Sequence, residues 1–525
     1  TQATGKNVAS TQDVYFAAGA VSKFIIKNPA DGTVDNPISV VIEAQDQFGN
    51  KNPTYNSDVT LNASGNAVGD GLIDIVSGVA TVSLTDTIAQ TVILTLSDSQ
   101  STGLNISSTQ DVIFSPGVVT KFVIIDPIDG TVDNPIPVTV EARDQYGNMN
   151  PNFQQDVALA VSGSATGAGV VNIINGSGWL NVSDQKSESV TLSLVDALGL
   201  GLDVSNTQVV QFAPGVVTKF TILDPADGTV DNPISVTIQA QDQYNNLNSN
   251  YQSDVTLNLS GGATGGGLVD ISNGVGIKSI SSTLSQIVTL TLTDTEATGK
   301  NVSSSQTVFF GAGNVSRFVI VDPVDGTTDD PVTVTVQAQD QFGNINYGYQ
   351  NDIFLNASGF ATGAGLVDII NGVGSRNISD TKAETITLSL TDAFMTGFNV
   401  TSTQNLIFAP GIPRKIVILN PTDGTTDNPI QVQVEAQDNG GNRTTGWAGN
   451  VTLNVNGSAT GAGTINIVNG VGSRNISDTL AETVTINLTD TFNTTLNTSS
   501  TQDVIFSAGA VSKLVIMNPA DGTVD

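Results

Sequence analysis

The sequence predicts an all-β protein, a tandem array of seven-stranded β-sandwich modules with a 98-residue period. Two observations predict this fold. An Asp-Gly pair recurs every 98 residues without insertion or deletion, at Asp31, Asp129, Asp227, Asp325, Asp423 and Asp521. Between these pairs, short segments that alternate apolar and polar residues are separated by turns rich in Gly, Asn, Asp and Pro. Because a 98-residue unit can enclose its own hydrophobic core, each repeat is predicted to be a domain.

The period also sets the expected domain boundaries. Residues 1–19 match the last strand of a module, and residues 510–525 match the first strand and loop of another. Between them the predicted modules are 20–117, 118–215, 216–313, 314–411 and 412–509. We therefore expect the sequence to be a segment of a longer array.

Residues 216–313 show the strands expected in every module. The segment Ile234–Ala240 alternates apolar and polar residues strictly, which is typical of a half-buried strand. The seven expected strands lie at 220–222, 234–240, 255–259, 268–271, 275–280, 288–292 and 308–310. The dipeptide Asn273-Gly274 suits a hairpin turn between the fourth and fifth of them. No segment has an apolar period near 3.6 that is long enough for a helix.

Columns of equivalent positions identify the expected core. The last strand always carries Phe: Phe16, Phe114, Phe212, Phe310, Phe408 and Phe506. The first strand carries Phe24, Phe122, Phe220, Phe318, Ile416 and Leu514. A third, aromatic column follows the second strand: Tyr55, Phe153, Tyr251, Tyr349 and Trp447. These rings could stack on sugars, but Phe153 shows that no hydroxyl is required, which favours packing against the core.

Composition excludes several kinds of chemistry. The chain has no Cys and no His, so disulfides, thiol chemistry, imidazole bases and the usual zinc sites are excluded. The formal charge is −31, with 18 Lys and Arg against 49 Asp and Glu. This excess of acid disfavours nucleic acid and anionic membrane surfaces as partners. Divalent cations are the natural counter-species.

An enzyme is not expected. Without His or Cys, catalysis would need paired carboxylates in a cleft, or a metal. Sandwich ends with short turns offer little concavity, and no Ser or Lys has an evident activating partner. An active site copied along a string of similar domains would also be unusual.

The connection between successive modules is short. It reads Ser115-Pro116-Gly117, Ala213-Pro214-Gly215 and Ala409-Pro410-Gly411 in three of the copies. Three residues that include Pro leave little freedom, so we expect modules held nearly end to end. At ~3.3 Å per strand residue, five such modules would form a rod of roughly 200 Å.

The frame of the third module also resembles a known family. Residues 236–244, Val255-Thr256-Leu257 and Asn273-Gly274-Val275 are similar to bacterial immunoglobulin-like domains of tandem-repeat surface proteins, such as invasin- and intimin-type modules and giant adhesin stalks. The shared AxDxxGN turn reads Asp144-Gln145-Tyr146-Gly147-Asn148 in the second copy, and Asn439-Gly440-Gly441-Asn442 departs from it in the fifth. The resemblance implies an immunoglobulin-like sandwich and a stalk, spacer or fibre outside a bacterial cell.

Acidic columns provide candidate metal ligands. We expect the loop after the first strand of one module to face the loops after the second and sixth strands of the next, so that Asp129 and Asp133 approach Asp242 and Asp294. Four converging carboxylates would suit Ca²⁺, which takes six to eight oxygen ligands. The candidates are Asp31, Asp35, Asp129, Asp133, Asp144, Asp196, Asp227, Asp231, Asp242, Asp294, Asp325, Asp329, Asp340, Asp392, Asp423, Asp427, Asp438 and Asp490. The alternative is that each Asp caps its own turn.

Two functions remain. The first is an extracellular structural rod, the stalk or spacer of a bacterial surface adhesin or fibre, with Ca²⁺ at its junctions. The second is a self-assembling filament or sheath, held by lateral contacts or strand donation, because strand faces such as Thr237 and Thr289 carry almost no charge. Expected partners are neighbouring copies, or surface ligands bound by domains outside this segment. Neither nucleic acid nor membrane insertion of this segment is expected.

Overall fold

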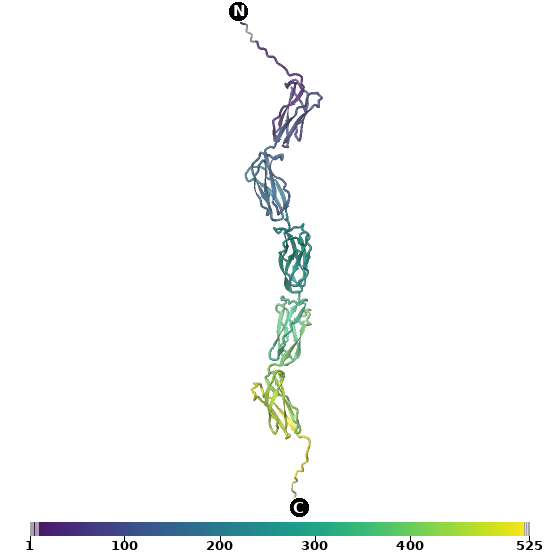
Figure 1. The fold of residues 1–525 in the computed structure, drawn as a ribbon, viewed down its shortest axis with the longest axis vertical. Coiled ribbons are helices and arrows are strands. Elements are labelled where there is room, and N and C mark those ends of the chain that lie inside the picture. Colours follow the sequence, from purple (N-terminus) through teal and green to yellow (C-terminus); the bar gives the residue numbers. More distant parts are fainter. Residues whose placement is uncertain (1–4, 6–9, 519, 521, 523–525) are drawn as a thin grey trace.

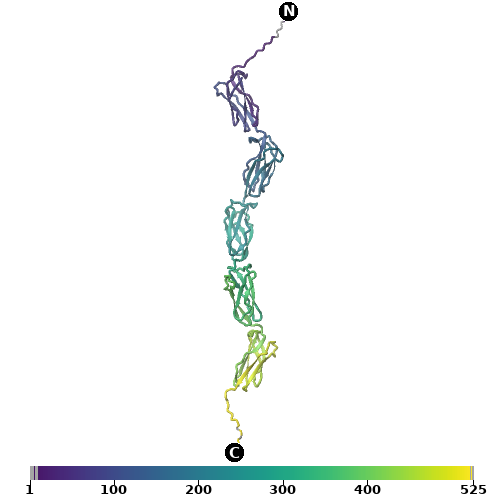
Figure 2. The same cartoon turned by 180° about the vertical axis from the view of Figure 1, so that it is seen from behind.

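The computed structural model describes residue 5, residues 10–518, residue 520 and residue 522. The chain folds into five β modules that follow one another in a line (Figure 1). The view from behind shows the same extended arrangement (Figure 2). Every secondary-structure element of the described residues is a strand, so the all-β prediction is confirmed, and none of these residues forms a helix with the length and hydropathy needed to cross a bilayer.

Each module contains eight strands. The first has β1 (Lys23–Ile26), β2 (Gly32–Thr33), β3 (Ile38–Gln45), β4 (Val59–Ala63), β5 (Gly71–Ile73), β6 (Val79–Leu84), β7 (Gln90–Ser97) and β8 (Gln110–Ser115). The second has β9 (Val119–Ile124), β10 (Gly130–Thr131), β11 (Ile136–Asp144), β12 (Val157–Val161), β13 (Gly169–Val171), β14 (Ser177–Val182), β15 (Ser189–Val195) and β16 (Thr207–Ala213). The third has β17 (Lys219–Ile222), β18 (Gly228–Thr229), β19 (Ile234–Gln241), β20 (Val255–Leu259), β21 (Gly267–Val269), β22 (Val275–Ile280), β23 (Gln286–Thr293) and β24 (Ser305–Gly311).

The last two modules repeat this order. The fourth has β25 (Arg317–Ile320), β26 (Gly326–Thr327), β27 (Val332–Gln339), β28 (Ile353–Ala357), β29 (Gly365–Val367), β30 (Val373–Ile378), β31 (Thr385–Thr391) and β32 (Thr403–Ala409). The fifth has β33 (Lys415–Ile418), β34 (Gly424–Thr425), β35 (Ile430–Gln437), β36 (Gly449–Val455), β37 (Gly463–Ile467), β38 (Val471–Ile476), β39 (Thr483–Thr489) and β40 (Thr501–Ser507). All seven strands expected from the sequence are therefore present, with one more in each module.

Two sheets form each sandwich. In the third module a three-stranded sheet has the order β17-β19-β22, and a five-stranded sheet has the order β18-β24-β23-β20-β21. The pairs are antiparallel except β18 and β24, which are parallel. The same two orders recur in all five modules, and they give the immunoglobulin-like sandwich that the sequence predicts.

The additional strand, β18, lets the start of each module join both sheets. After β17 has paired with β19, the chain crosses to the other sheet, where Gly228 lies opposite Phe310. A Cβ atom on Gly228 would lie 2.9 Å from Cγ1 of Ile234, so the repeated Asp-Gly pair needs Gly for space. Two residues are too few to show a period, which is why the sequence does not reveal this strand.

The Asn-Gly turn forms, but the expected hairpin does not. Asn273 and Gly274 have positive φ values of 52° and 77°, and Ser272 and Val275 exchange backbone hydrogen bonds of 3.0 and 3.1 Å. These are the features of a two-residue turn with both central residues left-handed. The prediction that β21 and β22 pair is nevertheless wrong, because β21 pairs with β20 and β22 pairs with β19 in the opposite sheet. The turn therefore connects the two sheets.

The predicted core columns are buried wherever a module surrounds them. Phe220 and Phe310 of the third module are 1% and 0% exposed. The aromatic column packs against this core, with the ring of Tyr251 edge-on to that of Phe220 at 5.6 Å between centroids. The terminal members differ: Phe16 and Leu514 are 89% and 94% exposed, because the chain there packs against no sheet.

The two terminal segments form no strand among their described residues, 10–18 and 510–518. Most of the remaining residues of the two predicted partial modules, among them Asp521, lie outside the described residues.

Candidate functional site: the module junctions

The repeated architecture directs attention to the joints between modules. At the joint of the second and third modules, the linker residue Gly215 donates its N–H to Oδ2 of Asp242 at 2.8 Å. Its carbonyl oxygen accepts a hydrogen bond of 2.9 Å from Nδ2 of Asn248. Both partners belong to the loop between β19 and β20. The linker is therefore fixed to the module that follows it.

Asp242 organises that loop. Its Oδ1 accepts the N–H groups of Tyr244 and Asn246, each at 2.9 Å, and its Oδ2 accepts the side-chain amide of Asn246 as well as Gly215. The side chain is completely buried. Burial raises the pKa of Asp242, but the hydrogen bonds from Asn246, Gly215 and Tyr244 outweigh burial, so the pKa lies below its ordinary value. The carboxylate therefore stays ionised at neutral pH.

Asp133 approaches the same linker from the preceding module. It lies in the loop between β10 and β11, where its Oδ2 accepts the N–H of Val216 at 2.7 Å. Its Oδ1 accepts the side-chain amide of Gln243, from the third module, at 3.2 Å. Adjacent linker residues are thus bound by carboxylates from the two sides of the joint.

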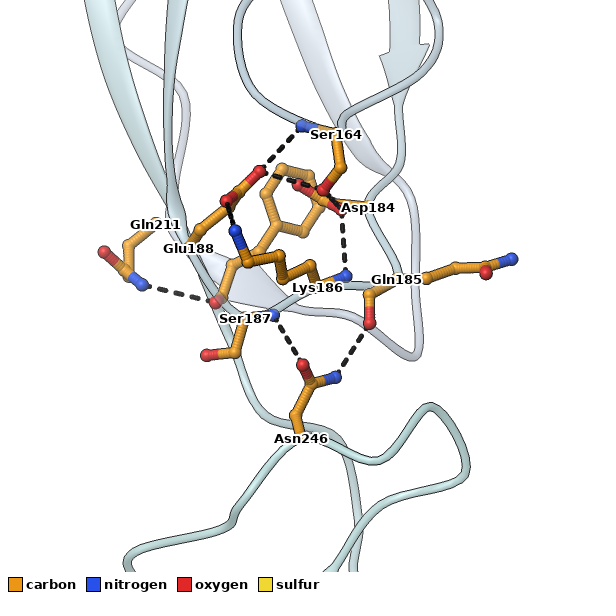
Figure 3. Close-up of polar contacts among 9 residues, drawn as sticks. Ser164, Asp184, Gln185, Lys186, Ser187, Glu188, Gln211 and Asn246 are labelled. Atoms are coloured by element: carbon orange, nitrogen blue, oxygen red, sulfur yellow. Dashed lines mark hydrogen bonds and ion pairs between the residues drawn. The ribbon is translucent and has the colours of Figure 1, made fainter.

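The most direct contact between the modules is made by Asn246 (Figure 3). Its Nδ2 donates to the carbonyl oxygen of Gln185 at 2.8 Å, and its Oδ1 accepts the N–H of Ser187 at 2.9 Å. Gln185 and Ser187 lie in the loop between β14 and β15 of the second module. A single side chain therefore forms two hydrogen bonds with the backbone of the neighbouring module.

Equivalent residues, here called junction asparagines, repeat this pair of bonds at every joint between two modules. Asn148 binds Thr87 O and Ala89 N, both at 3.0 Å. Asn344 binds Thr283 O at 2.9 Å and Ser285 N at 2.8 Å, and Asn442 binds Thr381 O and Ala383 N, both at 2.9 Å. Because the partner atoms belong to the backbone, the contacted residue can vary between copies without loss of the bond.

An apolar contact adds to the second joint. The side chain of Tyr244, from the third module, packs against the hydrophobic core of the second. A groove of about 710 Å³ runs beside it and is lined by both modules, with Asp133, Asp184, Lys186 and Asn246 among its residues.

The divergent fifth module keeps the main contacts of its joint by partly different means. Asp438 accepts the N–H of Gly411 at 2.9 Å and also the hydroxyl of Thr328 at 2.6 Å. Thr444 replaces the Asn that binds the linker carbonyl in other copies, and its hydroxyl bonds to Ala436 of its own module instead. The junction asparagine Asn442 is retained. The sequence of the loop therefore differs from that of the other copies, but its contact with the preceding module is the same.

The structure brings together only part of the predicted acidic cluster. Asp129 and its equivalents bind the last strand of their own module, since Asp129 Oδ1 accepts the N–H of Gln211 within β16 at 2.7 Å. Asp294 and its equivalents cap the loop that follows the seventh strand, where Asp294 accepts the N–H groups of Thr298 and Gly299. Only the columns of Asp133 and Asp242 meet at the linker.

The observed contacts of these carboxylates favour hydrogen bonding to the backbone over a calcium site. Their oxygens accept N–H groups, which already stabilise the negative charge. Within the described part of the chain, no group of three or more acidic residues could hold a metal ion. Calcium binding at the junctions therefore stays a prediction that these contacts do not support.

Removal of divalent cations tests the point. Since the junction carboxylates are stabilised by N–H donors, we expect the melting temperature of the chain to be the same in calcium and in excess chelator. Calorimetry in the two buffers measures this. A midpoint that falls by several degrees in chelator would restore calcium to the junctions.

The junction asparagines are the residues that sequence reasoning missed. The column Asn50, Asn148, Asn246, Asn344 and Asn442 is unbroken even in the divergent fifth loop, where most of its neighbours change. The persistence of Asn at this position, in a loop whose other residues vary, was the sequence signal that could have identified the junction asparagines. It did not show that the side chain points to the preceding module and not to its own turn.

Comparisons with known proteins concern the fold. The sequence matches no family model and no curated protein. Among solved structures, the chain is similar to the Escherichia coli adhesin FdeC (15% identity, 57% of this chain and 100% of that chain, TM-score 0.32). It is also similar to invasin, a bacterial integrin-binding protein (14%, 75% and 81%, TM-score 0.30), and to InvD of Yersinia pseudotuberculosis (17%, 55% and 97%, TM-score 0.27).

Proposed function

We propose that this chain is a rigid extracellular spacer, the stalk of a bacterial surface adhesin or fibre. The observation that carries the proposal is the repeated bonding of each junction asparagine to the backbone of the preceding module. A string of independent beads would not need such a contact at every joint. The function of the chain is then to hold other domains at a distance, and not to catalyse a reaction.

The energy of these contacts is sufficient for the role. Two hydrogen bonds from one asparagine, at about 1 kcal/mol each, favour the docked joint roughly 30-fold. The carboxylate contacts to the linker and the packing of Tyr244 add to this preference at the second joint. The extended, end-to-end arrangement of the five modules is what docked joints would produce (Figure 1).

The extracellular, bacterial setting is supported by the resemblance of the repeated frame and by composition. A long array without Cys and with a surface of Ser, Thr, Asn and Gln suits a secreted protein that does not depend on disulfides. The partner of the stalk would be bound by domains outside this segment.

Replacing Asn246 by Ala is expected to loosen the joint between the second and third modules. Since the chain has no Cys, spin labels can be attached at Cys introduced for the exposed residues Thr191 and Thr289. We expect the distribution of distances between the labels to widen about twofold, because the undocked joint becomes populated.

The matched control is Asn250→Ala, in the same loop, whose exposed side chain makes no hydrogen bond with the described residues. That variant should keep the narrow distribution. Equal, narrow distributions for both variants would remove the junction asparagine from the argument for rigidity.

A second function, lateral assembly into a filament or sheath, has one observation in its favour. The edge strands β5, β13, β21 and β29 expose an apolar side chain at the same position, Leu72, Val170, Leu268 and Leu366, each more than 40% accessible. Exposed apolar edges can associate. Lys278 and Arg376 bind the carbonyl oxygens of Leu268 and Leu366, so β5 and β13 are the edges without such a charge. Ordered bundles in micrographs of the purified chain would favour this function, whereas single rods would favour the spacer.

A further inference from the structure

A second repeated pair of residues brackets the loop that each junction asparagine contacts. This loop joins the sixth and seventh strands of a module, such as β22 and β23. The first position holds Asp86, Asp184, Ser282, Asp380 and Asp478, all buried. Four residues later stand Gln90, Glu188, Gln286, Glu384 and Glu482.

Two modules show how the buried position is satisfied. In the first, Nε2 of Gln90 donates to Oδ2 of Asp86 at 2.8 Å. In the third, Nε2 of Gln286 donates to Oγ of Ser282 at 2.9 Å. In both modules, the Gln that stands four residues after the buried residue therefore donates a hydrogen bond to it.

The other three modules have lost that donor. Where Glu replaces Gln, the Oδ2 atoms of Asp184, Asp380 and Asp478 are buried and accept no hydrogen bond from the described residues. Each of these side chains is no more than 4% exposed. A buried carboxylate oxygen without a partner costs free energy. The pair of the second module has a positive charge beside it, since Lys186 binds Glu188, whereas no ion pair among the described residues reaches the pairs of the fourth and fifth modules.

In the fifth module, as in the second, a serine hydroxyl lies between the two carboxyl groups. Oγ of Ser458 lies 2.6 Å from Oδ1 of Asp478 and 2.7 Å from Oε1 of Glu482. A hydroxyl has one hydrogen and can donate to only one of these oxygens. Oε1 of Glu482 also accepts the N–H of Ser458 at 2.6 Å, so the buried atom of the pair that lacks a donor is Oδ2 of Asp478.

No positively charged side chain among the described residues balances this pair. In the second module, Nζ of Lys186 lies 2.6 Å from Oε2 of Glu188, but the equivalent position in the fifth is Leu480. No Lys or Arg in the described part of the chain forms an ion pair with Asp478 or Glu482. Asp427, in the loop between β34 and β35, is the equivalent of Asp133, which lines the groove beside Asp184, and it adds negative charge on that side.

We propose that Asp478 and Glu482 bind one shared proton, with the protonated Glu482 donating to Oδ2 of Asp478 as Gln90 donates to Asp86. The proton is taken from solvent, and no covalent bond between residues forms or breaks. A carboxylic acid is close in shape to the amide that stands in the first and third modules, so the pair needs no additional space.

The fourth module has an equivalent pair, Asp380 and Glu384. Oδ2 of Asp380 is also buried without a hydrogen-bond donor among the described residues. Lys382 is the equivalent of Lys186, but its Nζ lies over the ring of Phe360, 4.4 Å from the centroid, and forms no ion pair with Glu384. The same shared proton would satisfy this pair.

Ionisation of the partner is consistent with this arrangement. Hydrogen bonding from Ser458 lowers the pKa of Asp478, and bonds from Leu480 N–H and Glu482 lower it further, while burial opposes them. Asp478 is therefore the member that stays ionised and accepts the proton of its partner.

The pH dependence follows from the proton count. The folded pair keeps a proton that the separated carboxyls of an unfolded chain release above a pH of about 4.3. The stabilisation is therefore complete below that pH and is lost as the pH rises and the folded pair releases its proton. The equivalent loop of the fourth module holds Thr381 and Ala383, the backbone partners of Asn442, so proton loss there would disturb a joint. That last consequence rests on the proposed spacer function, whereas the shared proton does not.

Glu482→Gln in the full chain tests the shared proton. The variant places in the fifth module the residue that the first and third already carry, so it is expected to fold. At pH 6, infrared difference spectra should show the loss of a protonated-carboxyl carbonyl band in the variant. At pH 7, hydrogen exchange in the peptide that spans residues 477–489 should be about tenfold slower in the variant, and the two chains should converge near pH 4.

Two further variants serve as controls. Gln90→Glu should create in the first module the band and the pH dependence that Glu482→Gln removes. Glu188→Gln should remove no band, because Lys186 already balances that carboxylate. Unchanged spectra and exchange in Glu482→Gln would overturn the proposal. It would also be overturned if added Na⁺, K⁺ or Ca²⁺ slowed exchange of the unmodified chain at pH 7 as much as acid does, because a cation would then occupy the pair.

Discussion

Replacing Asp438 by Ala is expected to lower the free energy of unfolding of the fifth module by about 3 kcal/mol. The side chain is completely buried and accepts hydrogen bonds from Gly411 N, Asn442 N and the hydroxyl of Thr328. Its removal leaves these donors without an acceptor and frees the linker. The effect should therefore reach both the stability of the module and the rigidity of its joint.

Trp447 provides the measurement, because its side chain packs against the core of the fifth module and the second Trp of the chain, Trp179, is 61% exposed. Denaturant unfolding followed by Trp fluorescence then reports chiefly on this module. The control is Asn439→Ala, at the exposed neighbouring position, which should leave the midpoint unchanged. Equal midpoints for the two variants would show that Asp438 does not organise the loop.

The contribution of Asp438 also depends on pH. Burial raises its pKa, but hydrogen bonds from Thr328, Asn442 and Gly411 outweigh burial and hold the pKa below its ordinary value. A depressed pKa means that the stabilisation is present above the unfolded value of about 3.9 and is lost as the pH falls through the folded value. The difference between the unmodified chain and Asp438→Ala should therefore shrink in acid.

Replacing Phe506 by Ala is expected to cost the fifth module about 4 kcal/mol. The ring is 1% exposed in the core between the two sheets, and its deletion leaves a cavity as well as lost apolar burial. The same Trp447 fluorescence titration measures the loss.

Ile505, the adjacent residue on β40, points out of the core and is 45% exposed. Ile505→Ala should change the stability by less than about 1 kcal/mol. Comparable losses for the two variants would contradict the assignment of inner and outer faces to this strand.

Much of the fold could be predicted because strand alternation and the 98-residue period are properties of the sequence itself. The expected strand 234–240 is observed as Ile234–Gln241, and 255–259 is observed as Val255–Leu259. The pairing of β21 and β22 was wrong because a turn sequence fixes the reversal of the chain but not the sheet that each strand joins. That choice depends on which apolar side chains meet in the core.

The junction could be predicted only in part for a related reason. Strand order places Asp133 and Asp242 at facing ends of successive modules, and both do bind the linker. It does not show the direction of a side chain within its loop, so Asp129 and Asp294 were expected at the joint although each binds the backbone of its own module. The same limit concealed Asn246, whose partners are backbone atoms and leave no signature in the residue types they belong to.

The main-chain character of that contact has an evolutionary consequence. The pair of bonds from a junction asparagine depends on no side chain of the neighbouring module, so any copy of the repeat can supply its partners. Unequal recombination that deletes, duplicates or shuffles whole repeats would therefore preserve this pair of bonds at each new joint, and the length of the protein could drift between lineages.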